Sequence, residues 1–104
     1  MPRFLITYHG GVEMPSSPEA REQMMSAFLT WAGSVGDDMV DPGSPLGPSK
    51  VVTSSGETDG KATEPVSGFT IIRTENLESA VDLVRSHPFL SRGGTLQVSE
   101  EVAP

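Results

Sequence analysis

His9 and Asp41 are the residues of this sequence whose surroundings best fit acid–base chemistry. His9 ends an apolar segment and is followed by Gly10 and Gly11. Histidine exchanges protons near neutral pH, so His9 is a candidate general base, and two adjacent glycines would allow a ligand to approach closely. The alternative is a surface histidine at the end of a strand, with the glycines making a turn.

Asp41 lies in the segment Val-Asp-Pro-Gly, at the end of a possible short strand. A carboxylate at this position can orient His9, or act itself as an acid or base where it is withdrawn from water. Alternatively, an aspartate before proline begins a turn and binds its own backbone. We predict that His9 and Asp41 form a catalytic pair, and that Gly10, Gly11 and Trp31 line the substrate site. The simplest interpretation of Trp31 by itself is a core residue, whose N–H needs a partner when buried.

His87 has a simpler interpretation. It precedes Pro88 at the expected end of a helix. A protonated histidine there would meet the negative end of the helix dipole. We therefore expect a structural role for His87.

The composition excludes several classes of function. Without cysteine, and with two distant histidines, the chain offers no metal-ligand pattern, and no phosphate loop or dinucleotide fingerprint occurs, so we expect no metal and no cofactor. Seven basic residues against 14 acidic ones, a net charge of −7, argue against nucleic-acid binding. No apolar run is long enough for a membrane span or a signal peptide. We expect one cytoplasmic domain over residues 1–104.

Five strands and two helices make up the expected secondary structure. Strands are predicted at Pro2–His9, Lys50–Ser54, Gly68–Arg73 and Leu96–Val98, with a short strand at Met39–Asp41 that Pro42 breaks and a hairpin turn near Ser55-Gly56. One helix begins after Ser17, with Pro18 in its first turn, and ends at Gly33 or Gly36. A second begins after Asn76 and ends at His87-Pro88.

The order β-α-β-β-α-β indicates an α+β, ferredoxin-like fold with an antiparallel sheet in the order 4-1-3-2 and both helices on one face. The first and third of its strands are the central ones, and in this sequence they carry apolar residues on both faces. Helices on one face leave the other uncovered. A second copy of the chain is the simplest cover, so we predict a homodimer.

Several segments, in order, resemble the YCII-related (DGPF) domain family. They are Tyr8–Gly11, Val40–Pro45, Gly68–Ile72 and the stretch from Ala80 through His87-Pro88 to Gly93-Gly94 and Leu96–Val98. The resemblance implies a dimeric α+β barrel. It also implies kinship with enzymes of aromatic degradation that act on muconolactone-like or chlorinated ring compounds without a bound cofactor.

Two functions follow as hypotheses. The first is a cofactor-free enzyme that acts on a small cyclic or aromatic metabolite by proton transfer, with His9 and Asp41 as the pair. The second is a non-catalytic dimeric domain that binds a small ligand in the same pocket.

Overall fold

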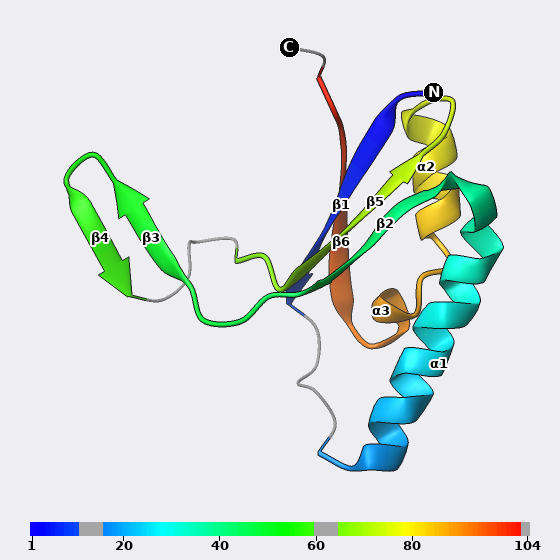
Figure 1. Ribbon diagram of the computed structural model, residues 1–104, viewed down its shortest axis with the longest axis horizontal. Helices are drawn as coiled ribbons and strands as arrows, with labels where there is room; N and C mark the ends of the chain where they lie inside the picture. Colours follow the sequence, from blue (N-terminus) through cyan, green and yellow to red (C-terminus); the bar gives the residue numbers. More distant parts are fainter. Residues whose placement is uncertain (11–15, 60–64, 103–104) are drawn as a thin grey trace.

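A computed structural model describes residues 1–10, 16–59 and 65–102. Its main sheet consists of β1 (Arg3–Gly10), β2 (Met39–Pro45), β5 (Gly68–Arg73) and β6 (Gly94–Glu100). The strands lie in the order β2-β5-β1-β6, and every neighbouring pair is antiparallel (Figure 1). The α+β class, the ferredoxin-like topology and the predicted strand order are therefore confirmed.

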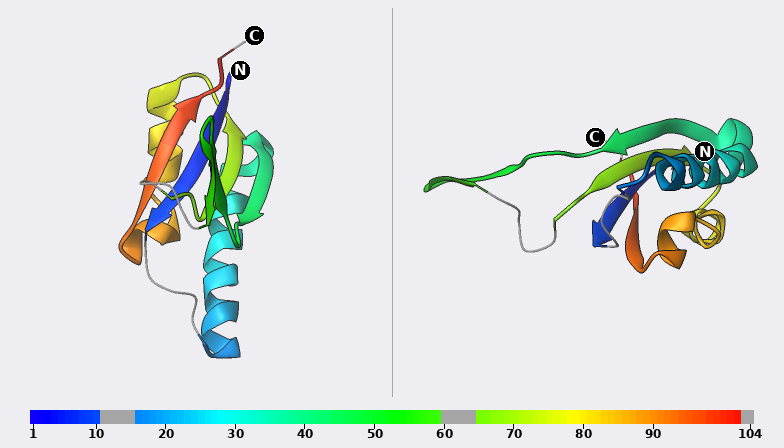
Figure 2. Two further views of the ribbon diagram at one scale, coloured as in Figure 1. Left: turned by 90° about the vertical axis from the view of Figure 1, so that its left-hand side faces the viewer. Right: turned by 90° about the horizontal axis from the view of Figure 1, so that it is seen from below.

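The helices lie together on one face of this sheet (Figure 2). They are α1 (Pro18–Val35), the short 3-10 turn η1 (Gly36–Asp38), α2 (Leu77–Val84) and α3 (Pro88–Ser91). Both predicted N-caps form: the Ser17 hydroxyl accepts the Ala20 N–H at 3.1 Å, and the Asn76 side chain accepts the Ser79 N–H at 2.8 Å. None of the helices in the described ranges is long and apolar enough to cross a bilayer.

The hydrophobic core fills the space between the helices and the sheet. Phe4, Ile6 and Ile72 of the central strands are fully buried there. Trp31 and Val35 of α1, and Ala80 and Val84 of α2, complete the cluster. Alternation along β1 directs Phe4, Ile6 and Tyr8 toward the helices, so the intervening residues face the other way.

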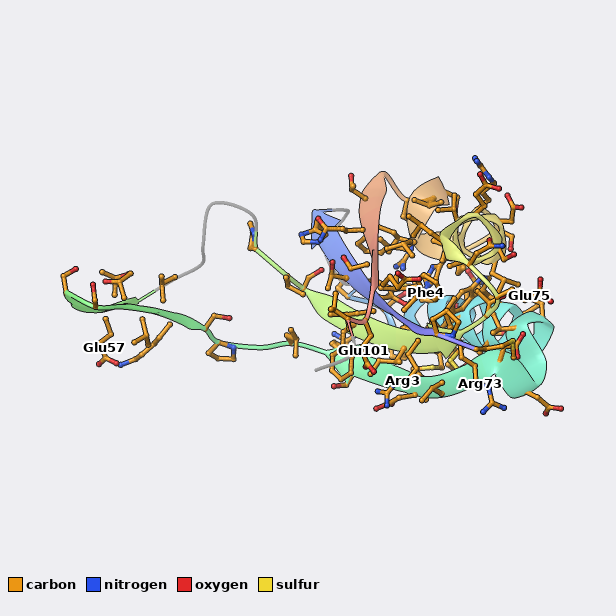
Figure 3. The ribbon with its side chains drawn as sticks, turned by 90° about the horizontal axis from the view of Figure 1, so that it is seen from above. Arg3, Phe4, Glu57, Arg73, Glu75 and Glu101 are labelled. Atoms are coloured by element: carbon orange, nitrogen blue, oxygen red, sulfur yellow. The ribbon has the colours of Figure 1, made fainter. Side chains whose placement is uncertain are left out.

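That opposite side, which we call the open face, carries Leu5, Thr7 and His9 of β1. Leu5 is 40% exposed, and its neighbour in register, Ile71, is only partly buried. No described helix covers this side (Figure 2). Figure 3 shows Arg3 and Glu101 side by side at one end of the sheet, where their side chains form an ion pair at 3.4 Å.

The strand β2 differs from the prediction, because it continues through Pro42 instead of stopping there. Its pairing with β5 shifts register between Met39 and Asp41 and again between Asp41 and Ser44, so Pro42 lies within an irregular part of an edge strand, where proline is tolerated. Gly43 has a φ of 74°, and a Cβ atom there would lie 1.7 Å from the Phe69 carbonyl oxygen. Only glycine fits this close approach.

The predicted hairpin is present as β3 (Lys50–Thr53) and β4 (Gly56–Asp59). These strands pair with each other and not with the main sheet. The hairpin projects away from the body of the molecule, as the position of Glu57 shows (Figures 1 and 3). Val52 is 74% exposed, so much of the apolar surface of this ribbon faces solvent.

Candidate functional site

His9 lies on the open face with a defined ring orientation. Its Nδ1 is 3.0 Å from the Pro65 carbonyl oxygen, and its Nε2 is 2.8 Å from the Thr7 hydroxyl. A carbonyl can only accept, so Nδ1 carries the proton of the neutral ring, and the lone pair of Nε2 accepts a hydrogen bond from the Thr7 hydroxyl. The arrangement suits a general base whose ring is oriented by the backbone at Pro65.

Asp41 does not lie beside His9. Asp41 is opposite Ile71 on β5, and Ile71 is opposite Leu5 on β1, four residues before His9. With about 3.3 Å a residue along a strand and about 4.8 Å between strands, the two α-carbons are roughly 16 Å apart. The Asp41 carboxylate instead accepts the Gly43 N–H at 2.8 Å, which is the turn-forming alternative. The structure thus does not bring the predicted catalytic pair together.

The predicted substrate-binding residues lie in different environments. Gly10 ends β1 with a φ of 67° and open space around it, and Gly11 falls outside the described residues. Trp31 is 3% exposed, and its indole N–H donates to the Leu83 carbonyl at 2.9 Å. That bond is the one a buried tryptophan needs, so Trp31 has the contacts of a core residue.

A chain of hydrogen bonds on the helix side joins His87 to β1, β5 and β2. His87 Nδ1 accepts the Phe89 N–H at 3.0 Å, so Nε2 carries the proton and donates to the Tyr8 oxygen at 2.6 Å. The Tyr8 hydroxyl donates to Thr70 at 2.8 Å, because the Thr70 hydroxyl already donates to the Pro42 carbonyl at 2.9 Å. Every donor in this series of hydrogen bonds, from Phe89 to Thr70, has an acceptor.

These contacts correct the expected role of His87. It is neutral, 3% exposed and caps the start of α3, rather than being a cation at the end of α2. Burial first, and the charge of Arg92 second, lower the pKa of His87 to about 4. Burial also raises the pKa of Tyr8 above its ordinary value. Both groups therefore stay uncharged at neutral pH, and the lone pair of the imidazole is already used by the cap.

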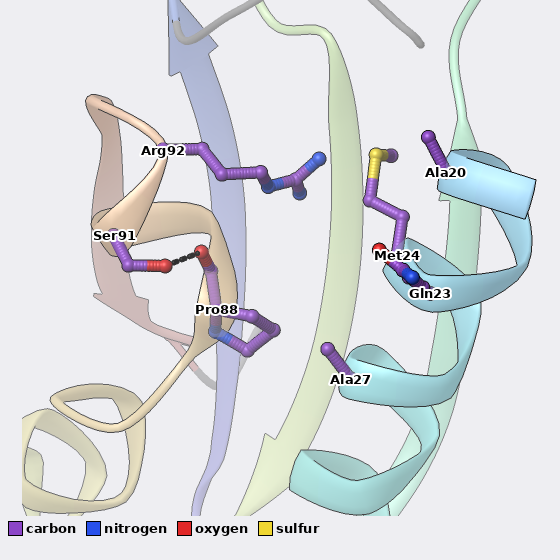
Figure 4. A pocket seen from close by; sticks show the side chains of 7 residues that line it. All are labelled: Ala20, Gln23, Met24, Ala27, Pro88, Ser91 and Arg92. Carbon is purple, nitrogen blue, oxygen red and sulfur yellow. Dashed lines mark hydrogen bonds between the residues drawn. The ribbon is translucent and has the colours of Figure 1, made fainter. Parts of the chain in front are cut away.

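A pocket of about 270 Å³ lies next to this network, between α1 and α3 (Figure 4). Apolar side chains of both helices make most of its walls, and three polar side chains complete it. The lining residues are Ala20, Gln23, Met24, Ala27, Pro88, Ser91 and Arg92. Gln23, Ala27 and Ser91 are exposed at its rim, so the pocket opens to solvent. We call it the α1–α3 pocket.

Arg92 is the charged residue of this pocket. Figure 4 shows its side chain extending from the turn after α3 toward Met24 of α1. Its guanidinium lies over the Phe89 ring, 5.5 Å from the centroid, and its Nε is buried without a hydrogen-bond partner. Our sequence analysis missed Arg92. The sequence feature that could have marked Arg92 as a candidate is its place before the turn residues Gly93-Gly94, with no acidic residue within four positions on either side.

A second hollow, of about 320 Å³, lies near the start of β1, at the end of that strand away from His9. It is lined by Phe4, Leu5, Ile71, Ser99, Glu100 and Glu101. Its charged residues are acidic, and Glu101 already pairs with Arg3. Across residues 1–10, 16–59 and 65–102, no three histidine or carboxylate side chains gather closely enough to hold a metal ion.

Comparison with known proteins supports the fold and gives no family by sequence. No family model and no curated protein matches the chain. The structure is similar to that of 5-chloro-2-hydroxyhydroquinone dehydrochlorinase from Burkholderia phenoliruptrix, solved in complex with 2,5-dihydroxybenzoquinone. The two chains are 19% identical, the match covers 91% of this chain and 90% of the other, and the TM-score is 0.52. At this identity the likeness shows a shared fold.

Proposed function

We propose that this protein binds a small cyclic or aromatic metabolite in the α1–α3 pocket. The observation that carries the proposal is the make-up of that pocket, with apolar walls from two helices and a few polar groups at defined positions. Ligand sites in proteins share this composition, and their volumes begin near 300 Å³, so a cavity of about 270 Å³ suits a compound with a single ring.

The structural neighbour supports the same class of ligand. Its name describes action on a chlorinated hydroquinone, and its structure holds a dihydroxybenzoquinone. Both are oxygen-bearing single rings. The resemblance of the sequence to the YCII-related family implies ligands of this kind as well.

Acid–base catalysis by His9 is a second candidate function. The observation that favours it is the ring orientation, with Nδ1–H directed at the Pro65 carbonyl and the basic Nε2 left to a hydroxyl group. Such a base would take a proton from a carbon or oxygen of the ring substrate and return it, without a cofactor. Its site would be on the open face, since no described residue that lines the α1–α3 pocket is a histidine, aspartate or glutamate.

We also propose that the protein is a homodimer, assembled through the open face as in a dimeric α+β barrel. Leu5, Phe69 and Ile71 form an apolar strip there that no described helix covers. A stable interface of this kind buries on the order of 2,000 Å² in total. The projecting hairpin adds to this argument, because a solitary two-stranded ribbon is only marginally stable in water.

Blocking the α1–α3 pocket tests the binding proposal. Ala27→Trp places a large side chain in the pocket, and Ser26→Trp places the same side chain at an exposed position of α1 outside it. We expect 2,5-dihydroxybenzoquinone to raise the thermal midpoint of the unmodified protein and of Ser26→Trp, and to leave Ala27→Trp unchanged.

Two results would contradict the proposal. One is an Ala27→Trp variant that still binds the quinone as the unmodified protein does. The other is an unmodified protein that responds to no compound in a panel of hydroquinones, hydroxybenzoquinones and lactones.

A further inference from the structure

Arg92 is fixed by the turn in which it stands. Its backbone N–H bonds to the Phe89 carbonyl at 3.2 Å as α3 ends, and Gly93, with a φ of 82°, turns the chain into β6. The side chain then crosses the wall of the α1–α3 pocket above the Phe89 ring. The backbone at Arg92 is therefore fixed where α3 ends, and the guanidinium lies against the Phe89 ring.

The hydrogen-bonding capacity of this cation is not used within the described part of the chain. The guanidinium carbon lies over the Phe89 ring, 5.5 Å from its centroid, and this contact supplies no oxygen acceptor for the N–H groups. The buried Nε has no partner, and no described carboxylate forms an ion pair with Arg92. In a chain with 14 acidic and seven basic residues, a cation without a carboxylate partner is unexpected.

Leaving the Nε–H donor of a guanidinium buried without an acceptor is unfavourable, and a ligand with an acceptor oxygen in the pocket would satisfy it. A guanidinium presents its N–H groups as a planar fork, which matches a carboxylate or an ionised ring hydroxyl. The apolar walls formed by Ala20, Met24, Ala27 and Pro88 suit the ring itself.

We propose that Arg92 selects the ligand of the α1–α3 pocket by its charge, so that this pocket takes a small ring compound bearing an anionic oxygen. The proposal rests on the proposed binding function and adds the substrate class and the residue that determines it. Gln23 and Ser91 at the rim are neutral, which leaves Arg92 as the only charged group among the described residues that line the pocket.

Benzoate and benzamide test the charge directly, because they share one shape and differ in charge. We would titrate each into the ¹⁵N-labelled protein and into Arg92→Gln, with Arg85→Gln as the control. Arg85 is the exposed C-cap residue of α2 and pairs with Asp82, so its loss changes the net charge equally and touches no described residue of the pocket.

Benzoate is expected to bind the unmodified protein more tightly than benzamide and to shift the Arg92 Nε–H signal. In Arg92→Gln the benzoate affinity should fall about tenfold to a hundredfold, with benzamide unchanged, since a hydrogen bond to a charged group contributes this much. Arg85→Gln should bind both probes as the unmodified protein does. Titration with 4-nitrophenolate then tells whether a ring oxyanion is accepted as well as a carboxylate.

Equal affinity for the two probes, or an Arg92→Gln variant that keeps its benzoate affinity, would overturn the role of Arg92 and leave the binding proposal standing. A failure of both probes together with 2,5-dihydroxybenzoquinone would remove the binding proposal and this one with it. The Arg92 Nε–H signal gives the answer in the unmodified protein, so the test does not depend on the folding of a variant.

Discussion

The two faces of the sheet each hold one histidine, and the two differ in every property that decides chemistry. On the helix side, His87 is 3% exposed. Its lone pair accepts a hydrogen bond from the Phe89 N–H, and its Nε2–H donates a hydrogen bond to the Tyr8 oxygen. On the open face, His9 is half-buried, and its lone pair has only the Thr7 hydroxyl as a partner. One histidine is therefore buried against the helices, and the other lies on the face that no described helix covers.

Neutral histidine has two tautomers, and the backbone selects a different one on each face. A backbone N–H holds the proton of His87 on Nε2, and a backbone carbonyl holds that of His9 on Nδ1. Because His87 cannot accept a proton without losing the cap of α3, it is unsuited to act as a base. The residue type alone is therefore a poor guide to function, and the partners of each nitrogen are a better one.

The largest expected contrast comes from placing a charge on either face at adjacent residues. Ile6→Asp removes a fully buried side chain and leaves an unpaired carboxylate in the core, which should cost at least about 5 kcal/mol, so the protein should be largely unfolded. Leu5→Asp, on the open face, should change the stability of the monomer by less than about 1 kcal/mol and prevent dimerisation. Circular dichroism and sedimentation equilibrium measure the two effects.

The same measurements can contradict the proposed difference between the two faces. A stable, folded monomer of the unmodified protein at micromolar concentration would show that the open face needs no partner. A Leu5→Asp variant that remains a dimer would place the interface elsewhere.

A smaller effect is expected from the pH dependence of stability. The pKa of His87 is about 4 in the folded protein and about 6.5 in an unfolded chain. As the pH falls from 6.5 to 4, only the unfolded chain takes up this proton, so the free energy of unfolding should fall by about 3 kcal/mol and then level off for this group. Urea denaturation at a series of pH values gives the curve.

The variant His87→Asn isolates this contribution from that of the carboxylates. Asparagine can cap α3 by accepting the Phe89 N–H, and it does not titrate. The difference between the two proteins should therefore change across this pH range. Parallel curves would mean that His87 is not held neutral by its burial.

Local signals predicted the fold well. Ser17 and Asn76 cap their helices through bonds to residues three positions ahead, so the cap can be read from a short stretch of sequence. The strand order followed from the apolar character of both faces of β1 and β5. The path of β2 through Pro42 could not be predicted, because it depends on Gly43 lying against Phe69 of another strand.

The candidate site was harder to predict because its contacts are long-range. Tyr8 and His87 are 79 residues apart in the chain and meet only through the fold. Asp41 was paired with His9 because both precede turn residues, yet the register of β5 separates them. Arg92 is recognisable only once α1 and α3 are seen to line a pocket between them.

The smallest expected change in stability is that of His9→Gln. The hydrogen bonds of His9 are neutral and half-exposed, so their loss should lower the free energy of unfolding by less than about 1 kcal/mol, in contrast to the loss at His87. The binding of 2,5-dihydroxybenzoquinone in the α1–α3 pocket should be unchanged, since His9 is on the other face of the sheet.

Turnover separates the two candidate functions at this residue. With 5-chloro-2-hydroxyhydroquinone as the probe and chloride release as the readout, a general base at His9 predicts that His9→Gln lowers the rate about 10²–10⁴-fold. Thr7→Val removes only the hydroxyl beside Nε2 and should preserve the rate. Turnover that survives in His9→Gln would exclude the histidine as the base. An unmodified protein that binds the quinone and releases no chloride from this probe would instead favour the binding function. His9 would then be an oriented histidine on the open face that does not act as a base on this compound.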